Sequence, residues 1–198
     1  MPLVVVGSTR ASSHTSAHAP VSPAAGWAAI VVTMNLRSRA WAQRRLRSLM
    51  WLELLNIPLQ AVIWFGKVGF PVTAGNSVGF ALFAMLLLEG AGYWAAKLRQ
   101  IATRSRSLPG AGAFVFARRG NVAVLVAGLL FIVWAVVVDP GVGSWPGLAF
   151  GLFAVLEQVN YFHVQLMYDT AADLRYLRSH GLRRAHLARD LAVRAGIR

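Results

Sequence analysis

Four continuous apolar runs constrain this chain more than any other feature of its sequence. They cover residues 49–66, 78–98, 121–138 and 146–168, and each is about 20 residues long. An α-helix rises 1.5 Å per residue, so about 20 residues cross the roughly 30 Å hydrocarbon core of a bilayer. The runs lack the two-residue alternation of a membrane β-barrel. We therefore predict an all-α integral membrane protein with a bundle of four transmembrane helices over residues 49–168.

The segment before the first run divides into two parts. Residues 1–33 are rich in Ser, Ala, His and Pro without periodicity, which predicts a disordered segment, and Met34 is an alternative start of the organised chain. Residues 34–48 carry five arginines between apolar side chains. Two interpretations of them are open: a basic amphipathic helix on the membrane surface, or a charged flank of the first span. Pro58 within that span predicts a kink.

The basic residues predict the orientation of the bundle. Of the 20 Lys and Arg residues, all but Lys67 lie before the first run, in the connection from Lys97 at the end of the second run to Arg119, or after the fourth run. By the positive-inside rule, both termini and the middle loop are cytoplasmic, and the protein belongs to the cytoplasmic membrane. The excess of Arg over Lys, with abundant Ala, Val and Gly, suggests a bacterial genome rich in G and C.

The same distribution of charge predicts the partners of the flanks. Membrane topology accounts for the net charge of +13, so we expect no nucleic-acid partner and instead anionic lipids at the cytoplasmic face. Residues 169–198 form a basic cytoplasmic tail in this interpretation. The fourth helix continues into the tail, and a second helix at about residues 182–195 places Leu187 and Leu191 on one face, which favours docking on the membrane surface over a free tail.

Polar residues interrupt three of the apolar runs at similar depth. All three glutamates of the chain lie inside the runs, where hydrocarbon penalises a carboxylate. Helical spacing places them on one face of the first, second and fourth helices together with Asn, Tyr and His, in the cytoplasmic half of the membrane. The third run has no polar residue past Asn121 and is expected to be scaffold. The predicted ligand-binding residues are Glu53, Asn56, Glu89, Tyr93, Glu157, Asn160, Tyr161 and His163.

Three functions are open for this polar centre. We favour a site that binds or transports a small polar or cationic ligand, which implies a homo-oligomer because four helices are few for a complete pathway. An interaction or scaffold protein with a structural polar core is the first alternative. A metal-dependent membrane enzyme is the second, although Glu157 and His163 are six residues apart and not three as in di-iron bundles. Its candidate metal ligands are Glu157, His163, Glu89 and Glu53.

No reaction or cofactor is predicted. The chain contains no cysteine, which removes thiolate metal ligands and cysteine nucleophiles. Phosphatase, glycosyltransferase, nucleotide-binding and Ser-His-Asp signatures are absent from the sequence. The sequence therefore favours a binding or transport protein over an enzyme.

Overall fold

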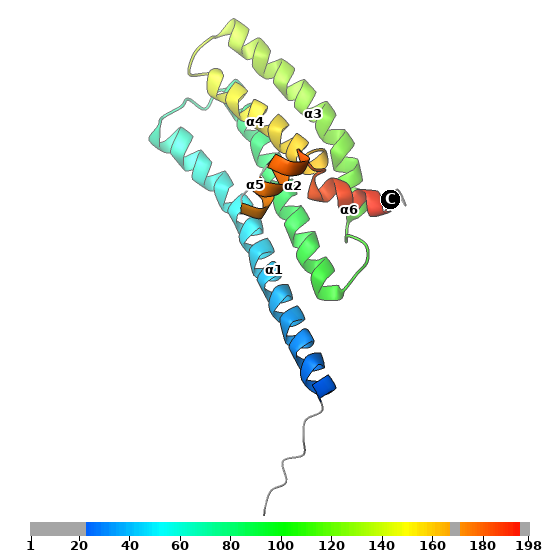
Figure 1. Ribbon diagram of the computed structural model, residues 1–198. Helices are drawn as coiled ribbons and strands as arrows, with labels where there is room; N and C mark the ends of the chain where they lie inside the picture. The colour runs from blue at the N-terminus through cyan, green and yellow to red at the C-terminus, as the bar shows by residue number, and fades with distance from the viewer. Residues whose placement is uncertain (1–22, 167–170, 195–198) are drawn as a thin grey trace, which may run out of the picture. The chain divides into compact units, whose positions relative to one another are not determined.

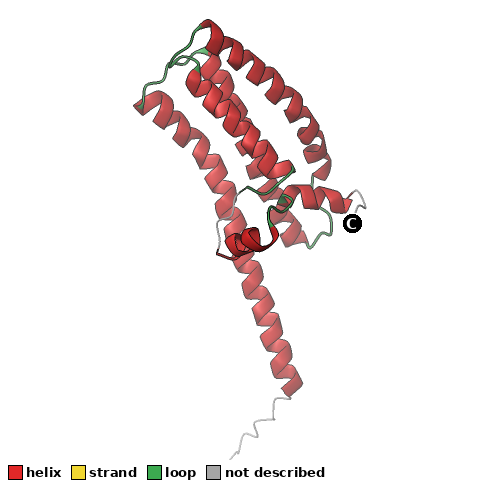
Figure 2. Ribbon diagram, turned by 45° about the horizontal axis from the view of Figure 1, so that its top comes forward, coloured by secondary structure: helices red, strands yellow, loops and turns green. Residues whose placement is uncertain are grey.

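The computed structural model describes residues 23–166 and 171–194, and this part of the chain is helical (Figures 1 and 2). The chain divides into two units, Met1–Ser38 and Arg39–Arg198, and all side-chain features described below belong to the second. Within the described residues, the extended structure is limited to one isolated antiparallel bridge between Val164 and Arg184. The prediction of an all-α protein is confirmed. The elements are α1 (Pro23–Ala61), the π-helix η1 (Val62–Lys67), α2 (Ala74–Thr103), α3 (Ala111–Val138), α4 (Trp145–Phe162), α5 (Ala171–His180) and α6 (His186–Arg194).

Three helical segments of the described chain are long and apolar enough to cross a membrane. They are Ser38–Lys67, Ala74–Thr103 and Ala111–Val138, and they contain the first three predicted spans. The fourth predicted span, α4, is 18 residues long but is not among them. Its last six residues include Glu157, Gln158 and Asn160, which lower its hydropathy.

The secondary structure of the segment before the first apolar run differs from the expectation. Helix α1 begins at Pro23, inside the segment predicted to be disordered, and residues 1–22 lie outside the described residues. The separate surface helix expected at residues 34–48 is instead the continuous start of the first apolar helix. The reason is local, because no Gly or Pro separates the basic stretch from the apolar run and its Ala, Arg, Gln and Leu residues all favour a helix.

Pro58 lies inside α1, and the backbone changes its hydrogen-bonding pattern one turn later. Proline has no N–H, so the carbonyl one turn before it loses its helical partner. The π-helix η1 follows, and the Val68 N–H donates to the Ile63 carbonyl five residues earlier at 2.8 Å. The π-helix is rare in proteins and occurs mostly as a single turn of this kind within a longer helix.

Helix α4 ends at Phe162, six residues before the predicted end of the fourth span. The expected continuous helix into the tail is therefore wrong at residues 163–166, which are not helical. Their backbone groups are paired with a distant segment: the Gln165 N–H donates to the Arg183 carbonyl at 3.0 Å, and the Ala185 N–H to the His163 carbonyl at 3.1 Å. The Asn160 side chain accepts from the Leu166 N–H at 2.8 Å and stabilises the turn.

Helices α2, α3 and α4 form the packed core of the second unit. Helix α2 packs most extensively against α4, and both pack against α3. Helix α6 lies on α4 and α3, where Leu187 and Leu191 are buried in the same core. These two leucines were expected to face the membrane surface, but the end of the bundle covers them. The core side chains from the three long helices include Leu82, Leu86, Leu125, Ile132, Ala154 and Phe162.

Glycine permits the close approach of α2 and α4. A Cβ atom on Gly79 would collide with the backbone of Gly147, and one on Gly147 would collide with the backbone of Gly75. A Cβ on Gly151 would press on Leu129 of α3 at 2.9 Å. Both α2 and α4 thus carry a Gly-x-x-x-Gly motif, which is a common basis for helix association in membranes: Gly75, Gly79 and Gly147 face the α2–α4 contact, and Gly151 faces α3.

Asn76 joins the connections at this end of the bundle. Its side chain is fully buried, and its Nδ2 donates to the carbonyls of Pro71 and Val142 at 2.9 Å each. Its Oδ1 accepts from the Gly147 N–H at 2.8 Å. Asn76 therefore links α2, the chain before it and the start of α4 through three hydrogen bonds.

The Gly79→Ala variant should strongly destabilise the protein. Its new methyl group meets backbone that cannot move without separating α2 from α4, so we expect a loss of about 2 kcal/mol or more in the free energy of unfolding. Gly92→Ala is the matched control in the same helix, because its Cβ would meet open space. That control should be neutral or stabilising by up to about 1 kcal/mol. Denaturation of both variants in detergent measures the difference, and equal stability would refute the close helix contact.

Candidate functional site

A cavity of about 340 Å³ lies where α1, α2 and α4 meet the chain around the start of α6. We call it the polar cavity, and we call the end of the bundle that contains it the basic end. Its wall combines aromatic rings with one carboxylate and several basic side chains. The lining residues are Trp41, Ala42, Arg45, Leu46, Leu49, Glu53, Tyr93, Trp94, Lys97, Asn160, Tyr161, Gln165, Arg183, His186 and Leu187.

Glu53 and Tyr161 connect α1 to α4 at the wall of the polar cavity. The Tyr161 hydroxyl donates to Glu53 Oε1 at 2.8 Å. Gly90 of α2 makes room for this bond, since a Cβ there would collide with the Tyr161 ring. Glu157 is near enough to interact electrostatically with both groups, and it accepts from Asn160 Nδ2 at 3.3 Å. The structure thus brings four predicted site residues to one place.

The Trp94 indole N–H lies beside this pair. Its Nε1 is buried and makes no hydrogen bond of normal geometry in the described part of the chain, but it makes a weak hydrogen-bonding interaction with the Glu53 carboxylate. A donor held in this way gains less than the roughly 0.5–1.5 kcal/mol of a well-formed hydrogen bond. Trp94 also lines the cavity, so an acceptor on a bound molecule could complete this bond.

Asp190 attaches α6 to the face of α2 that lines the polar cavity. It accepts from the Tyr93 hydroxyl at 2.8 Å and forms an ion pair with Lys97 at 2.8 Å. Tyr93 was predicted to face a ligand, and the structure adds that its hydroxyl is bound to α6. Asp190 was missed, although its position as a lone acid among the arginines of the last helix was a usable signal.

Glu89 belongs to a different cluster. Asn121 of α3 donates from Nδ2 to Glu89 Oε2 at 2.6 Å and to Gln158 Oε1 at 3.0 Å. Gln158 Nε2 in turn donates to the Arg118 carbonyl at 3.3 Å. Glu89 does not line the polar cavity, and α3 contributes a buried polar residue to this cluster, whereas the sequence suggested an apolar scaffold.

The remaining predicted residues lie outside the polar cavity. His163 is exposed, and its backbone contributes to the turn after α4: its N–H donates to the Val159 carbonyl at 2.9 Å, and its carbonyl accepts from the Ala185 N–H. Within the residues that the structure describes, no three His, Asp or Glu side chains are placed to hold a metal ion. The candidate metal ligands Glu157, His163, Glu89 and Glu53 are not gathered into such a group.

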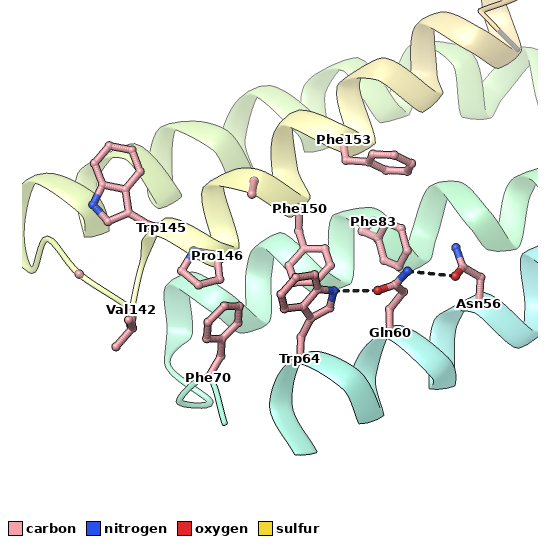
Figure 3. Close-up of a pocket in the computed structure, with 12 residues that line it drawn as sticks. Asn56, Gln60, Trp64, Phe70, Phe83, Val142, Trp145, Pro146, Phe150 and Phe153 are labelled. Carbon is pink, nitrogen blue, oxygen red and sulfur yellow. Dashed lines mark hydrogen bonds between the residues drawn. The ribbon is translucent and has the colours of Figure 1, made fainter. Parts of the chain in front are cut away.

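A second and larger cavity, of about 730 Å³, follows the same side of α1 toward the other end of the bundle (Figure 3). We call it the apolar cavity. Trp64 donates to Gln60 Oε1 at 2.7 Å, and Gln60 donates to Asn56 Oδ1 at 3.2 Å, so these polar groups bind one another along α1. Aromatic and aliphatic side chains form most of the wall: Trp64, Phe70, Phe83, Val142, Trp145, Pro146, Ala149, Phe150 and Phe153.

The Asp190→Asn variant should loosen α6. It removes the charge that pairs with Lys97 and weakens the bond from Tyr93, and hydrogen bonds to charged groups contribute about 1.5–3 kcal/mol. We expect amide hydrogen exchange in α6 to accelerate at least about tenfold, equivalent to about 1.4 kcal/mol. Asp139→Asn, on an exposed acid after α3, is the control and should leave α6 exchange unchanged. Equal exchange in the two variants would contradict the role of this ion pair.

Comparison with known proteins does not assign the chain to a family. No protein-family model, curated protein or solved structure matches the chain. The function therefore has to be inferred from the two cavities, the membrane helices and the distribution of charge.

Proposed function

We propose that this chain is a multi-pass protein of the cytoplasmic membrane that binds a small polar ligand in the polar cavity. The observation that carries the proposal is a carboxylate and a buried indole N–H that line one cavity. Glu53 and Trp94 border the same space beside the basic end, and the Trp94 N–H interacts with Glu53 without a hydrogen bond of normal geometry. A ligand with a donor for Glu53 and an acceptor for Trp94 would complete the hydrogen bonds of both groups.

Helix α4 is the fourth membrane helix in this proposal. It packs along α2 and α3, both of which are long and apolar enough to span a bilayer. Its 18 residues extend about 27 Å, close to the hydrocarbon thickness. Its polar residues are directed to partners such as Asn121 and Glu53, which lowers the cost of placing them in the membrane.

The basic end faces the cytoplasm in this proposal. Arg45, Lys97 and Arg183 gather at the polar cavity, and positive residues are retained on the cytoplasmic side of a membrane. The cavity would then be reached from the cytoplasm, with both chain termini on that side. Anionic lipids would surround this end, as expected for clustered arginines.

The charges around the cavity favour a zwitterionic ligand over a simple cation. Glu53 can accept from an ammonium group, and Trp41 and Trp94 provide aromatic faces that attract cations. The positive charges of Arg45 and Arg183, which also line the cavity, would repel a ligand with only positive charge. A molecule with an ammonium and an anionic group fits both parts of the wall.

A structural role for the polar residues is the second candidate. The Glu89 cluster supports it, because Asn121 and Gln158 complete their hydrogen bonds within the protein. Such clusters define helix register without binding a ligand. The two candidates differ in whether the polar cavity takes up a solute, and that is directly measurable.

The Glu53→Gln variant should weaken ligand binding and leave the fold intact. The amide oxygen can still accept from Tyr161, but the charge opposite the ammonium is lost. With phosphoethanolamine as the probe, we expect the dissociation constant in nanodiscs to rise at least about tenfold, for a charged contact of about 1.5–3 kcal/mol. Calorimetry of the two proteins measures this.

Glu89→Gln is the matched control for that experiment. It removes a membrane carboxylate outside the cavity and should not change the dissociation constant. Ethanolamine or inorganic phosphate alone should bind more weakly than phosphoethanolamine. Absence of binding to the unaltered protein, or an equal effect of both variants, would favour the structural role.

Cysteine labelling should reveal the orientation, since the chain has no cysteine of its own. Val142 lies exposed in the loop before α4, and Ser107 lies exposed in the loop between α2 and α3. In intact cells, an impermeant maleimide should label Val142→Cys and should label Ser107→Cys only after permeabilisation. The reverse pattern would overturn the proposed orientation.

A further inference from the structure

One face of α1 lines both cavities. Leu49 and Glu53 belong to the polar cavity, and Asn56, Gln60 and Trp64 belong to the apolar cavity. These residues are spaced by three or four, so they form a single stripe along the helix. The two cavities therefore follow one another along this face, and we call the strip between the face and α4 the seam.

Helix α4 forms the other side of this seam. Phe150 and Phe153 line the apolar cavity, and Asn160 and Tyr161 line the polar cavity. The hydrogen bond from Tyr161 to Glu53 joins the two helices at the wall of the polar cavity. Helix α1 does not share the extensive packing that joins α2, α3 and α4, and both cavities lie on this side of α4.

The apolar cavity suits a hydrocarbon chain. Its polar side chains, Asn56, Gln60 and the Trp64 indole, already bind one another along α1. The Phe70 ring stacks on Trp64 at 5.3 Å between centroids, and Phe150 meets Trp64 edge-on at 6.4 Å. The wall thus presents aromatic faces rather than unused hydrogen-bonding groups to an occupant.

We infer that the ligand is a zwitterionic amphiphile whose head group occupies the polar cavity and whose hydrocarbon chain occupies the apolar cavity. This inference rests on the proposed function and names the class of its ligand. From Glu53 of α1 to Trp64 of η1 the seam extends eleven residues, or about 16 Å, which accommodates the chain of a membrane lipid. The molecule would enter from the bilayer along α1.

Ordinary annular lipid is the rival occupant. Within a bilayer a chain gains no hydrophobic energy by moving from lipid to protein, so chain contact alone would be nonselective and unsaturable. Binding in the seam should instead depend on the head group and on the space between α1 and α4. These two dependences distinguish a site from the lipid that surrounds any membrane helix.

Photolabelling tests the inference with the full chain. The protein is reconstituted in phosphatidylglycerol vesicles with a phosphoethanolamine amphiphile that carries a diazirine in the middle of its chain. Crosslinks are then mapped by mass spectrometry. We expect labelling at Phe150 and Phe153 that an excess of the unlabelled amphiphile reduces at least tenfold, and labelling of α3 that it does not reduce.

Two tryptophan variants test whether the labelled site is the apolar cavity. Ala149 lines the apolar cavity, so Ala149→Trp should fill it and reduce the seam labelling at least tenfold. Ala127 lies exposed on α3, and Ala127→Trp should leave the seam labelling unchanged. Calorimetry with soluble phosphoethanolamine should be unaffected by either variant, which also shows that both proteins fold.

The outcomes separate this inference from the proposed function. If the competitor does not reduce labelling of the seam, the site for the hydrocarbon chain is refuted. Calorimetry then decides separately whether the head group binds in the polar cavity. If Ala149→Trp removes the labelling but Glu53→Gln does not alter it, the chain site is supported and the proposed head-group site is refuted. Loss of labelling in both variants, with the Ala127→Trp protein unchanged, is the result expected for the amphiphile.

Discussion

The contact between α2 and α4 at their glycines is the interaction on which the rest of the second unit depends. In a membrane the hydrophobic effect does not drive helices together, so close packing and hydrogen bonds do so. Gly75, Gly79 and Gly147 bring the two backbones into contact, and Asn76 joins the adjoining connections there. Helix α3 packs on this pair, and α6 covers its basic end.

Helix α1 interacts with this core in a different way. The face that it directs to α4 carries Glu53, Asn56, Gln60 and Trp64, which are larger than the glycines of the α2–α4 contact. Large polar side chains hold two helices apart and leave space between them. The size of the side chains therefore explains both arrangements. Glycines let α2 and α4 touch, and the larger side chains of α1 leave the two cavities between α1 and α4.

The lengths of the apolar runs predicted the positions of α2 and α3, because the hydrophobicity that lets a helix span a membrane is a property of the run itself. The end of α4 was not predictable in this way. No Gly or Pro marks Phe162, and two of the hydrogen bonds that stabilise the turn come from Arg183 and Ala185, about twenty residues later. Local sequence contains no signal for a partner at that distance.

The polar residues show a second limit of sequence-based prediction. Spacing identified which face of each helix is polar, but it did not show which neighbouring helix that face meets. Glu53 meets Tyr161 of α4, whereas Glu89 meets Asn121 of α3. The Gly75-x-x-x-Gly79 motif was visible in the sequence, but it begins before the predicted start of the second span at residue 78.

Hydrogen-bond satisfaction distinguishes the two polar clusters within the same bundle. Around Glu89, Asn121 donates to two acceptors and Gln158 continues to a backbone carbonyl. Around Glu53, a cavity adjoins the carboxylate, and the Trp94 N–H interacts with that carboxylate without a hydrogen bond of normal geometry. A ligand that supplied a well-placed donor to Glu53 and an acceptor to Trp94 would add hydrogen bonds that the Glu89 cluster already makes within the protein. The adjoining space is the reason why we propose the ligand site at Glu53 and not at Glu89.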